Sequence, residues 1–406
     1  MSPRPGRRIA GDAPEPRLTR NPTRTYLDYN ASAPLRPEAR AAVADAFAAP
    51  GNPSSVHAEG RAARRIVEDA RAEIARLAQA APRCVTFVSG GTEAAATALN
   101  PHFGAGPAAP PLDRLIVGAG EHPCVLNGHR FPAHAVEIAP LTADGRLDLG
   151  WLAEACGRPG RAMLALQGAN NETGAIQPVA EAAALVHAAG GFVFCDAVQL
   201  AGRAPLAIAA LGADALALSA HKIGGPKGVG ALVTARPGVS LGEPLIRGGG
   251  QERGARGGTE NVAAIAGFGA AARAGAADER AETARLGALR EALAEAVSAA
   301  APDAVVFAKA APRLANTLCF AAPGVEAATL MIALDLAGVA VSSGSACSSG
   351  KVTPSHVLAA MGVPAGLARG AIRLSLGWAS REEDVARFAQ AFAAAIARLR
   401  RARGAA

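Results

Sequence analysis

The sequence has few aromatic residues, few lysines and no long apolar run. Of its 406 residues, 4% are Phe, Trp or Tyr, and only four of the 41 basic residues are lysines. No apolar run approaches the roughly 20 residues that a membrane-spanning helix needs, so no membrane association is expected. The arginines form no stripe interleaved with aromatic residues, so the net charge of +7 favours a solvated surface over nucleic-acid binding.

The six cysteines are far apart and include no Cys-x-x-Cys pair. This spacing excludes a zinc ribbon, so no metal site is expected, and a chain of this length does not suit a disulfide framework. We therefore predict a reducing, cytoplasmic location. Residues 1–24 lack the apolar centre of a signal peptide and are predicted to be a disordered tail, with a transit peptide as the alternative because the segment is rich in Arg and Pro.

Short apolar runs alternate with helical patterns, which predicts an α/β fold with a mostly parallel sheet and helices on both faces. A long charged helix over residues 279–301 is a plausible domain junction, and the shorter elements after it predict a smaller α+β domain. We expect a large domain over 36–278 and a small one built from 25–35 and 279–406. The predicted strands are 84–88, 115–117, 162–166, 192–195, 215–218, 317–320 and 372–375; the other predicted helices are 61–79, 179–189 and 382–401.

Residues 342–350 read Ser-Ser-Gly-Ser-Ala-Cys-Ser-Ser-Gly and contain a single thiol, Cys347. Glycine and serine favour turns and unfixed backbone, whereas most cysteines are buried as small apolar residues. We therefore expect a mobile loop that carries the Cys347 thiol in and out of solvent.

Three further features follow predicted strands, at the sheet edge where α/β proteins bind ligands. Lys222 is one of few lysines, and its amine could form a Schiff base; an ordinary surface lysine is the alternative. Asp196 could pair with a pyridinium nitrogen or cap the next helix. Residues 89–95, Ser-Gly-Gly-Thr-Glu-Ala-Ala, begin a helix whose free N–H groups suit a phosphate, although a simple helix cap at Thr92 and Glu93 explains them equally well.

A lysine, a strand-end aspartate and a phosphate-type helix start together predict pyridoxal 5'-phosphate as the cofactor. From about residue 26 to 399 the chain also resembles the cysteine desulfurases, which are class V, fold-type I pyridoxal-phosphate enzymes. The motifs that carry this resemblance are L-D-Y-N-A-S-A-P (27–34), G-N-P-S-S-V-H (51–57), S-G-G-T-E (89–93), G-E-H-P (120–123), N-N-E-T-G (170–174), D-A-V-Q (196–199), S-A-H-K-I-G-G-P-K-G (219–228), G-G-G-Q-E-R-G-A-R-G-G-T-E-N (248–261), S-S-G-S-A-C (342–347) and I-R-L-S-L-G (372–377).

The resemblance implies a role for each cofactor contact. Lys222 would form the Schiff base, Asp196 would pair with the pyridine nitrogen, and Gln199 would bond the ring's phenolic oxygen. The residues implied at the phosphate are Thr92, Ser219, His221 and, reaching from a neighbouring subunit, Thr259. Because Thr259 serves the other subunit in this family, a homodimer is implied.

The resemblance also implies the reaction. L-Cysteine would lose its sulfur to Cys347, leaving L-alanine and a persulfide for a sulfur-acceptor protein such as an iron–sulfur scaffold. His122 would stack on the ring and act as an acid or base, although a packed or capping histidine is the alternative. The residues implied around the substrate are Asn30, Asn171 and Arg373; without the resemblance, Arg373 would read as a structural ion pair.

Two positions depart from the family pattern. Gly258 replaces the usual serine before Thr259, which removes a hydroxyl near the phosphate. Lys351 is unusual and could tune the choice of acceptor or simply be solvated. A selenocysteine lyase, a class V aminotransferase and a non-enzymatic persulfide carrier are the competing hypotheses; a transaminase needs no thiol on a mobile loop, and a bare carrier needs no Lys222.

Overall fold

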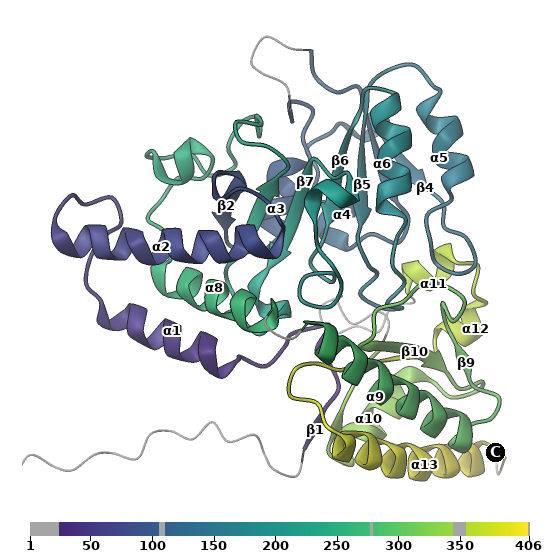
Figure 1. Cartoon of the computed structure of the whole chain (residues 1–406). Coiled ribbons are helices and arrows are strands. Elements are labelled where there is room, and N and C mark those ends of the chain that lie inside the picture. Colours follow the sequence, from purple (N-terminus) through teal and green to yellow (C-terminus); the bar gives the residue numbers. More distant parts are fainter. Residues whose placement is uncertain (1–23, 105–109, 277–278, 344–354, 405–406) are drawn as a thin grey trace, which may run out of the picture.

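A seven-stranded sheet lies at the centre of the larger part of the chain (Figure 1). The computed structural model describes residues 24–104, 110–276, 279–343 and 355–404. Within them the strand order of this sheet is β2-β8-β7-β6-β5-β3-β4. β8 runs antiparallel to both neighbours and the other pairs are parallel. The strands are β2 (Val85–Val88), β3 (Arg114–Gly118), β4 (Val136–Ala139), β5 (Ala162–Gln167), β6 (Phe192–Asp196), β7 (Ala215–Ser219) and β8 (Gly230–Thr234).

Helices cover both faces of this sheet. Successive residues of a strand point to opposite faces, and here they enter two different apolar clusters: Leu164 lies in a cluster with α6 and α8, and Ala165 in a cluster with α3 and α4. Both residues have no exposed surface, which explains why the strands read as continuous apolar runs. The helices of this region are α3 (Gly91–Ala98), α4 (Pro123–Leu126), α5 (Leu149–Cys156), α6 (Val179–Ala188), α7 (Ile208–Leu211) and α8 (Val262–Ala276).

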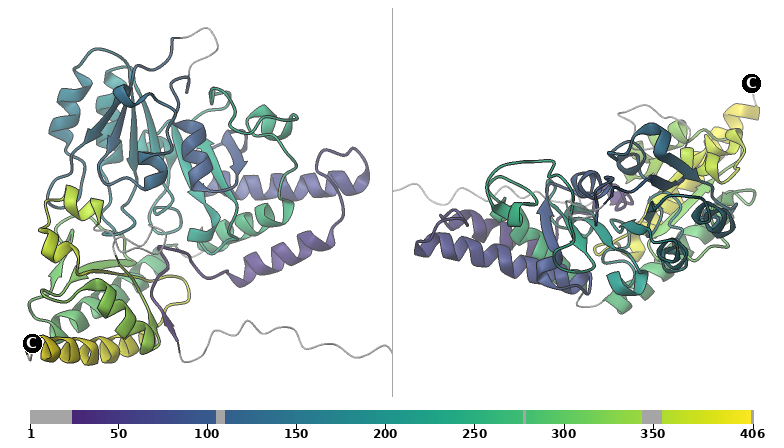
Figure 2. Two further views of the ribbon diagram at one scale, coloured as in Figure 1. Left: turned by 180° about the vertical axis from the view of Figure 1, so that it is seen from behind. Right: turned by 90° about the horizontal axis from the view of Figure 1, so that it is seen from above.

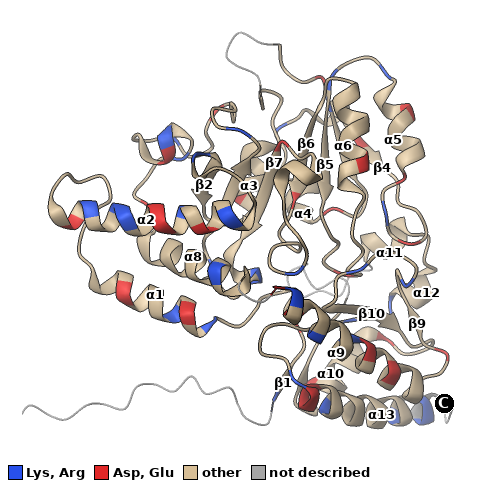
Figure 3. Ribbon diagram, in the orientation of Figure 1, with Lys and Arg blue, Asp and Glu red and all other residues tan. Residues whose placement is uncertain are grey.

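Two further helices, α1 (Pro37–Ala48) and α2 (Ala58–Leu77), project from the sheet and pack against α8. The views from the front, from behind and from above agree on this projection (Figures 1 and 2). Close packing at the α2–α8 contact requires a glycine, because a Cβ added at Gly269 would lie 2.7 Å from the Cα of Ala70. Figure 3 shows basic and acidic residues interspersed along α1 and α2 rather than segregated by sign.

The described residues also form a four-stranded antiparallel sheet, in the order β12-β13-β10-β9. Its apolar core includes Phe392, whose ring lies 5.5 Å from that of Phe320 and 5.3 Å from that of Phe388. The strands are β9 (Val305–Val306), β10 (Thr317–Ala321), β12 (Ser342–Ser343) and β13 (Ala371–Ser375). The helices of this region are α9 (Glu279–Ala300), α10 (Ala327–Leu336), α11 (His356–Ala360), α12 (Ala365–Ala368) and α13 (Glu382–Gly404).

The predicted fold class is confirmed, with a mostly parallel sheet, helices on both of its faces and a smaller sheet region. Strands β4 and β8 were not predicted from the sequence, and neither was the antiparallel direction of β8. The domain boundaries stay a prediction. They agree with the packing of Leu27, which joins the apolar cluster of α9 and α13, and with the parallel pairing of β1 (Thr25–Tyr26) with β11 (Val339–Ala340).

Membrane spans and metal clusters are both absent from the described part of the chain. None of its helices is long and apolar enough to cross a membrane. Among the same residues no group of three or more His, Cys, Asp or Glu side chains is arranged to bind a metal ion.

Candidate active site

A cavity of about 310 Å³ opens beyond the carboxyl ends of β5, β6 and β7. β6 ends at Asp196 and β7 at Ser219, and a short 3-10 turn, Ala220–Lys222, brings Lys222 to the cavity wall. Parallel strands place their carboxyl ends along one edge, so residues distant in sequence meet there. The predicted site residues that line this cavity are Asn30, Thr92, His122, Asn171, Asp196, Gln199, Ser219, His221, Lys222 and Arg373.

The amine of Lys222 lies between two backbone carbonyls that precede α1. Its Nζ donates to the carbonyl of Asn30 at 2.7 Å and to that of Ala31 at 2.9 Å. These contacts hold the amine inside the cavity, where a carbonyl compound could reach it. The geometry therefore does not favour the alternative of a solvated surface lysine.

Asp196 is a buried carboxyl, with 9% of its surface exposed. Its Oδ1 accepts the backbone N–H of Val198 at 3.0 Å, so it caps a turn; the predicted capping of a helix is wrong, because residues 198–203 form turns. Burial raises the pKa of Asp196, and the nearby His122 and Lys222 oppose that rise. The residue also lines the cavity, so capping and pairing with a cationic ligand are compatible.

His122 caps the N-terminus of α4. Its Nδ1 accepts the backbone N–H of Cys124 at 3.2 Å. Burial lowers the pKa of His122, which favours the neutral imidazole. Because Nδ1 accepts a hydrogen bond, the single ring proton of the neutral form is assigned to Nε2. His122 therefore both caps a helix and offers an Nε2–H donor.

The start of α3 lies at one end of the cavity, where Gly91 and Thr92 form part of its wall. A helix N-terminus presents unpaired backbone N–H groups that suit an anion. The predicted helix cap at Thr92 is wrong, because the N-cap is Gly90 and has no side-chain capping bond; Glu93 instead accepts the backbone N–H of Ser89 at 2.7 Å. His221, next to Lys222 in the chain, lines the same cavity. Burial, and then the positive charge of Lys222, lower the pKa of His221 to about 4.

Arg373 lies on the central β13 strand of the small sheet and is 2% exposed. Its Nη2 pairs with Asp28 at 2.8 Å, and its Nη1 donates to the carbonyl of Asn171 at 3.0 Å. The predicted structural ion pair thus exists. However, the buried Nε has no hydrogen-bond partner among the described residues. Arg373 also lines the cavity, so its guanidinium charge is available to a carboxylate ligand there.

Asn30 is held by hydrogen bonds from both regions of the chain. Its Nδ2 donates to the Oγ1 of Thr317 at 2.9 Å and to the carbonyl of Asn171 at 3.1 Å. Its Oδ1 accepts from Asn316 at 3.0 Å. These bonds fix the backbone carbonyl that receives the Lys222 amine.

Known proteins resemble this chain over almost its full length. Residues 25–388 match the family described as aminotransferase class-V. A cysteine desulfurase of Cereibacter sphaeroides is 42% identical over 89% of this chain and 92% of its own. The chain belongs to the cysteine desulfurase family. The structure of a NifS-like protein from Rickettsia africae superposes with a TM-score of 0.83 at 31% identity, over 92% of this chain and 99% of that protein. The structure of SspA in complex with cysteine superposes with a TM-score of 0.72 at 28% identity, over 87% and 98%.

Two predicted site residues of this desulfurase are not among those that line the cavity in the described part of the chain. Cys347 falls outside the described residues, so its position relative to the cavity is not described. Thr259 is exposed and does not line the cavity of its own chain. The segment that carries Thr259 is anchored by Glu252, which is buried and accepts two bonds of 2.8 Å from Arg71 and one of 2.9 Å from the backbone N–H of Phe87.

Several residues that shape the site were not predicted from the sequence. Cys124 lines the cavity, and burial raises the pKa of its thiol to about 12. Gln167 also lines the cavity. Glu172 and Glu121 are buried carboxyls next to the predicted Asn171 and His122. Cys124, Glu121 and Glu172 lie inside or beside the quoted motifs, and this position is the signal that could have identified them. The sequence alone does not show which side chains are buried.

Proposed function

We propose that this desulfurase binds pyridoxal 5'-phosphate and L-cysteine in the cavity and passes the substrate's sulfur to Cys347. The single observation that supports this most directly is the cavity itself. It gathers an amine, a buried carboxylate, a helix N-terminus and an arginine guanidinium. These are the groups that an aldehyde, a pyridine nitrogen, a phosphate and an amino-acid carboxylate require.

The residues present fit the proposed cofactor. Lys222 would hold its aldehyde carbon, Asp196 its ring nitrogen, and the first turn of α3 with Ser219 and His221 its phosphate. His221 is expected to be neutral at physiological pH, because its pKa is lowered to about 4. When bound, pyridoxal phosphate would withdraw electrons from the substrate's α-carbon and so weaken the bond between the substrate's β-carbon and its sulfur.

The chain's own residues would bind the substrate and move its protons. The guanidinium of Arg373 would bind the substrate carboxylate, with the carbonyl of Asn171 already fixing its orientation. Once displaced by the substrate, the Lys222 amine could accept the α-proton. His122 offers an Nε2–H at the same cavity, so it can supply a proton to the substrate during C–S cleavage.

The sulfur transfer needs a thiolate. Three of the described cysteines are poor candidates: burial raises the pKa of Cys124 to about 12, and it also raises those of Cys195 and Cys319. The resemblance to the cysteine desulfurases assigns the step to Cys347, in the motif S-S-G-S-A-C (342–347). Its thiolate would attack the substrate's sulfur as the C–S bond breaks, so that an S–S bond forms and L-alanine leaves after taking up a proton. The persulfide on Cys347 would then pass to a sulfur-acceptor protein.

Cysteine turnover by purified variants tests this proposal. Cys347→Ser is expected to keep the cofactor absorbance but to lose alanine and sulfide production from cysteine and a thiol reductant. Cys156→Ser serves as the matched thiol control, because Cys156 ends α5 outside the cavity wall, and it should retain activity. Lys222→Ala should lose the absorbance. Normal cysteine turnover by Cys347→Ser would refute the assignment, and selenocysteine turnover alone would indicate a selenocysteine lyase.

A homodimer in the cytoplasm completes the proposal. Its support is the position of Thr259, which is exposed and absent from its own cavity wall, so it is free to serve a second subunit. Light scattering on the holoenzyme should give twice the chain mass. Mixed dimers test the shared site: Thr259→Ala paired with Lys222→Ala should restore at most one working site per dimer.

A further inference from the structure

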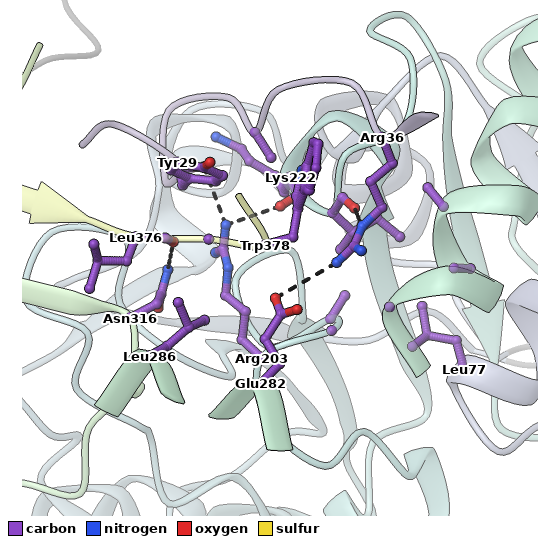
Figure 4. A pocket seen from close by; sticks show the side chains of 18 residues that line it. Tyr29, Arg36, Leu77, Arg203, Lys222, Glu282, Leu286, Asn316, Leu376 and Trp378 are labelled. Carbon is purple, nitrogen blue, oxygen red and sulfur yellow. Dashed lines mark hydrogen bonds and ion pairs between the residues drawn. The ribbon is translucent and has the colours of Figure 1, made fainter. Parts of the chain in front are cut away.

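A buried arginine lies directly behind Lys222, outside the cavity wall (Figure 4). Arg203 is 9% exposed and lines a small void of about 20 Å³ together with Arg36, Glu282 and Trp378. Within the described residues, Arg203 has no ion pair with a carboxylate, whereas Arg36 pairs with Glu282 at 3.7 Å. A buried cation without an anion is costly, so its position needs an explanation.

The hydrogen bonds of Arg203 all lead toward the site. Its guanidinium donates to the side-chain Oε1 of Gln199, to the carbonyl of Lys222 at 3.1 Å and to the carbonyl of Tyr29 at 3.3 Å. Figure 4 shows the bonds to Tyr29 and Lys222 converging on this one side chain. Burial lowers the pKa of Arg203 only to about 10, so the group stays charged near neutral pH.

The bond to Gln199 fixes which way its amide points. Arginine has donors only, so the group facing it must be the amide oxygen. The Nε2 of Gln199 therefore points the other way and donates to the carbonyl of Asn30 at 3.1 Å, on the cavity side. A flipped amide would place two donors against each other. Arg203 thus leaves Gln199 able to donate, but not to accept, at the cavity.

We infer that Arg203 is a positioning residue that locks Gln199 as a hydrogen-bond donor toward the cofactor's phenolic oxygen. The inference rests on the proposed function, because the oxygen it serves belongs to pyridoxal phosphate. Gln199 and Arg203 are four residues apart in the turns over 198–203, so their side chains can meet on the same side of this segment. The bond to the Lys222 carbonyl holds the lysine backbone at the same time.

A pH titration of the holoenzyme's visible absorbance tests this role. A hydrogen-bond donor at the phenolic oxygen stabilises the negative charge there. Loss of this donor should therefore raise the pKa of the Lys222 nitrogen that binds the cofactor. Arg203→Met is expected to raise the midpoint of the absorbance change by about one pH unit. It should also weaken binding of pyridoxal phosphate to the apoenzyme by roughly tenfold.

The matched variants separate positioning from general damage. Gln199→Met should give the same shift, and the double variant no more than either single variant, because both changes remove one donor. Arg36→Met alters the same void but not Gln199, so it should leave both measurements unchanged. If Arg203→Met does not fold, Arg203→Lys still tests the role: it cannot reach all three acceptors and should shift the midpoint in the same direction by a smaller amount.

Three results would overturn the inference: an additive double variant, an equal shift in Arg36→Met, or an unchanged midpoint and affinity in both Arg203 variants. Failure of the proposed function would look different. The wild-type apoenzyme would then bind no pyridoxal phosphate, and both proposals would fall together.

Discussion

Replacing Glu172 by glutamine should change how the stability of this desulfurase depends on pH. Glu172 follows Asn171 and is 4% exposed. One of its oxygens, Oε2, accepts a 2.5 Å hydrogen bond from the Ser355 hydroxyl, which also caps α11. Burial raises the pKa of Glu172 from an ordinary 4.5 to about 7, against the opposing effects of the Ser355 bond and the Arg373 charge.

The sign and size of the effect follow from this shift. Between pH 4.5 and 7 the folded protein keeps a proton on Glu172 that the unfolded chain releases, so stability falls as the pH rises through that window. From about pH 5 to about pH 8 the loss is about 2–3 kcal/mol at roughly 1.36 kcal/mol per pKa unit. For 406 residues, the corresponding change in Tm is about 3 °C. A glutamine at this position cannot titrate. The Tm of Glu172→Gln minus the Tm of wild type should therefore increase by this amount between about pH 5 and about pH 8.

Infrared spectroscopy measures the same protonation directly. The difference spectrum between wild type and Glu172→Gln should contain a carboxylic-acid carbonyl band that disappears with a midpoint near the pKa of about 7. Ser355→Ala removes the hydrogen bond that favours the ionised form, so it should move this midpoint to higher pH. A band that disappears in the range of an ordinary glutamate, or a Tm difference independent of pH, would refute the reasoning.

Two further predictions concern buried groups. Glu252→Gln leaves the buried Arg71 with only the half-exposed Glu68 as an anion. We therefore expect a loss of about 3 kcal/mol, seen by calorimetry as a Tm lower by about 4 °C; an unchanged Tm would contradict it. Burial raises the pKa values of the Cys195 and Cys319 thiols, so iodoacetamide at about pH 8 should modify them only after denaturation. Peptide mass mapping checks this, and labelling of either thiol in the native protein would disprove it.

The Glu172 and Arg203 predictions could not have been made from the sequence. Both depend on desolvation, which is set by how many distant segments cover a side chain. Glu172 is buried against Ser355, 183 positions along the chain, and Arg203 bonds the carbonyl of Tyr29, 174 positions away. In the sequence, these two residues look like an ordinary acid and an ordinary base.

The sequence by itself determined the strands that carry the site and the order of the polar residues at their ends. Uninterrupted apolar runs mark strands buried on both faces, and the residues after them, Asp196 and Lys222, were identified because open α/β sheets bind ligands at that edge. The direction of β8 could not be obtained in the same way, because it depends on pairing with β2 and β7 and not on local pattern.

Only the tertiary structure decided which of these residues share one space and in what chemical state. It brought Asn30, Asn171 and Arg373 to a single cavity, left the Nε of Arg373 without a partner among the described residues, and placed Thr259 on the outside. The physical reason is that contact and desolvation are properties of packing between distant segments. Local pattern fixes the elements, whereas protonation, amide orientation and unpaired donors depend on the neighbours that folding supplies.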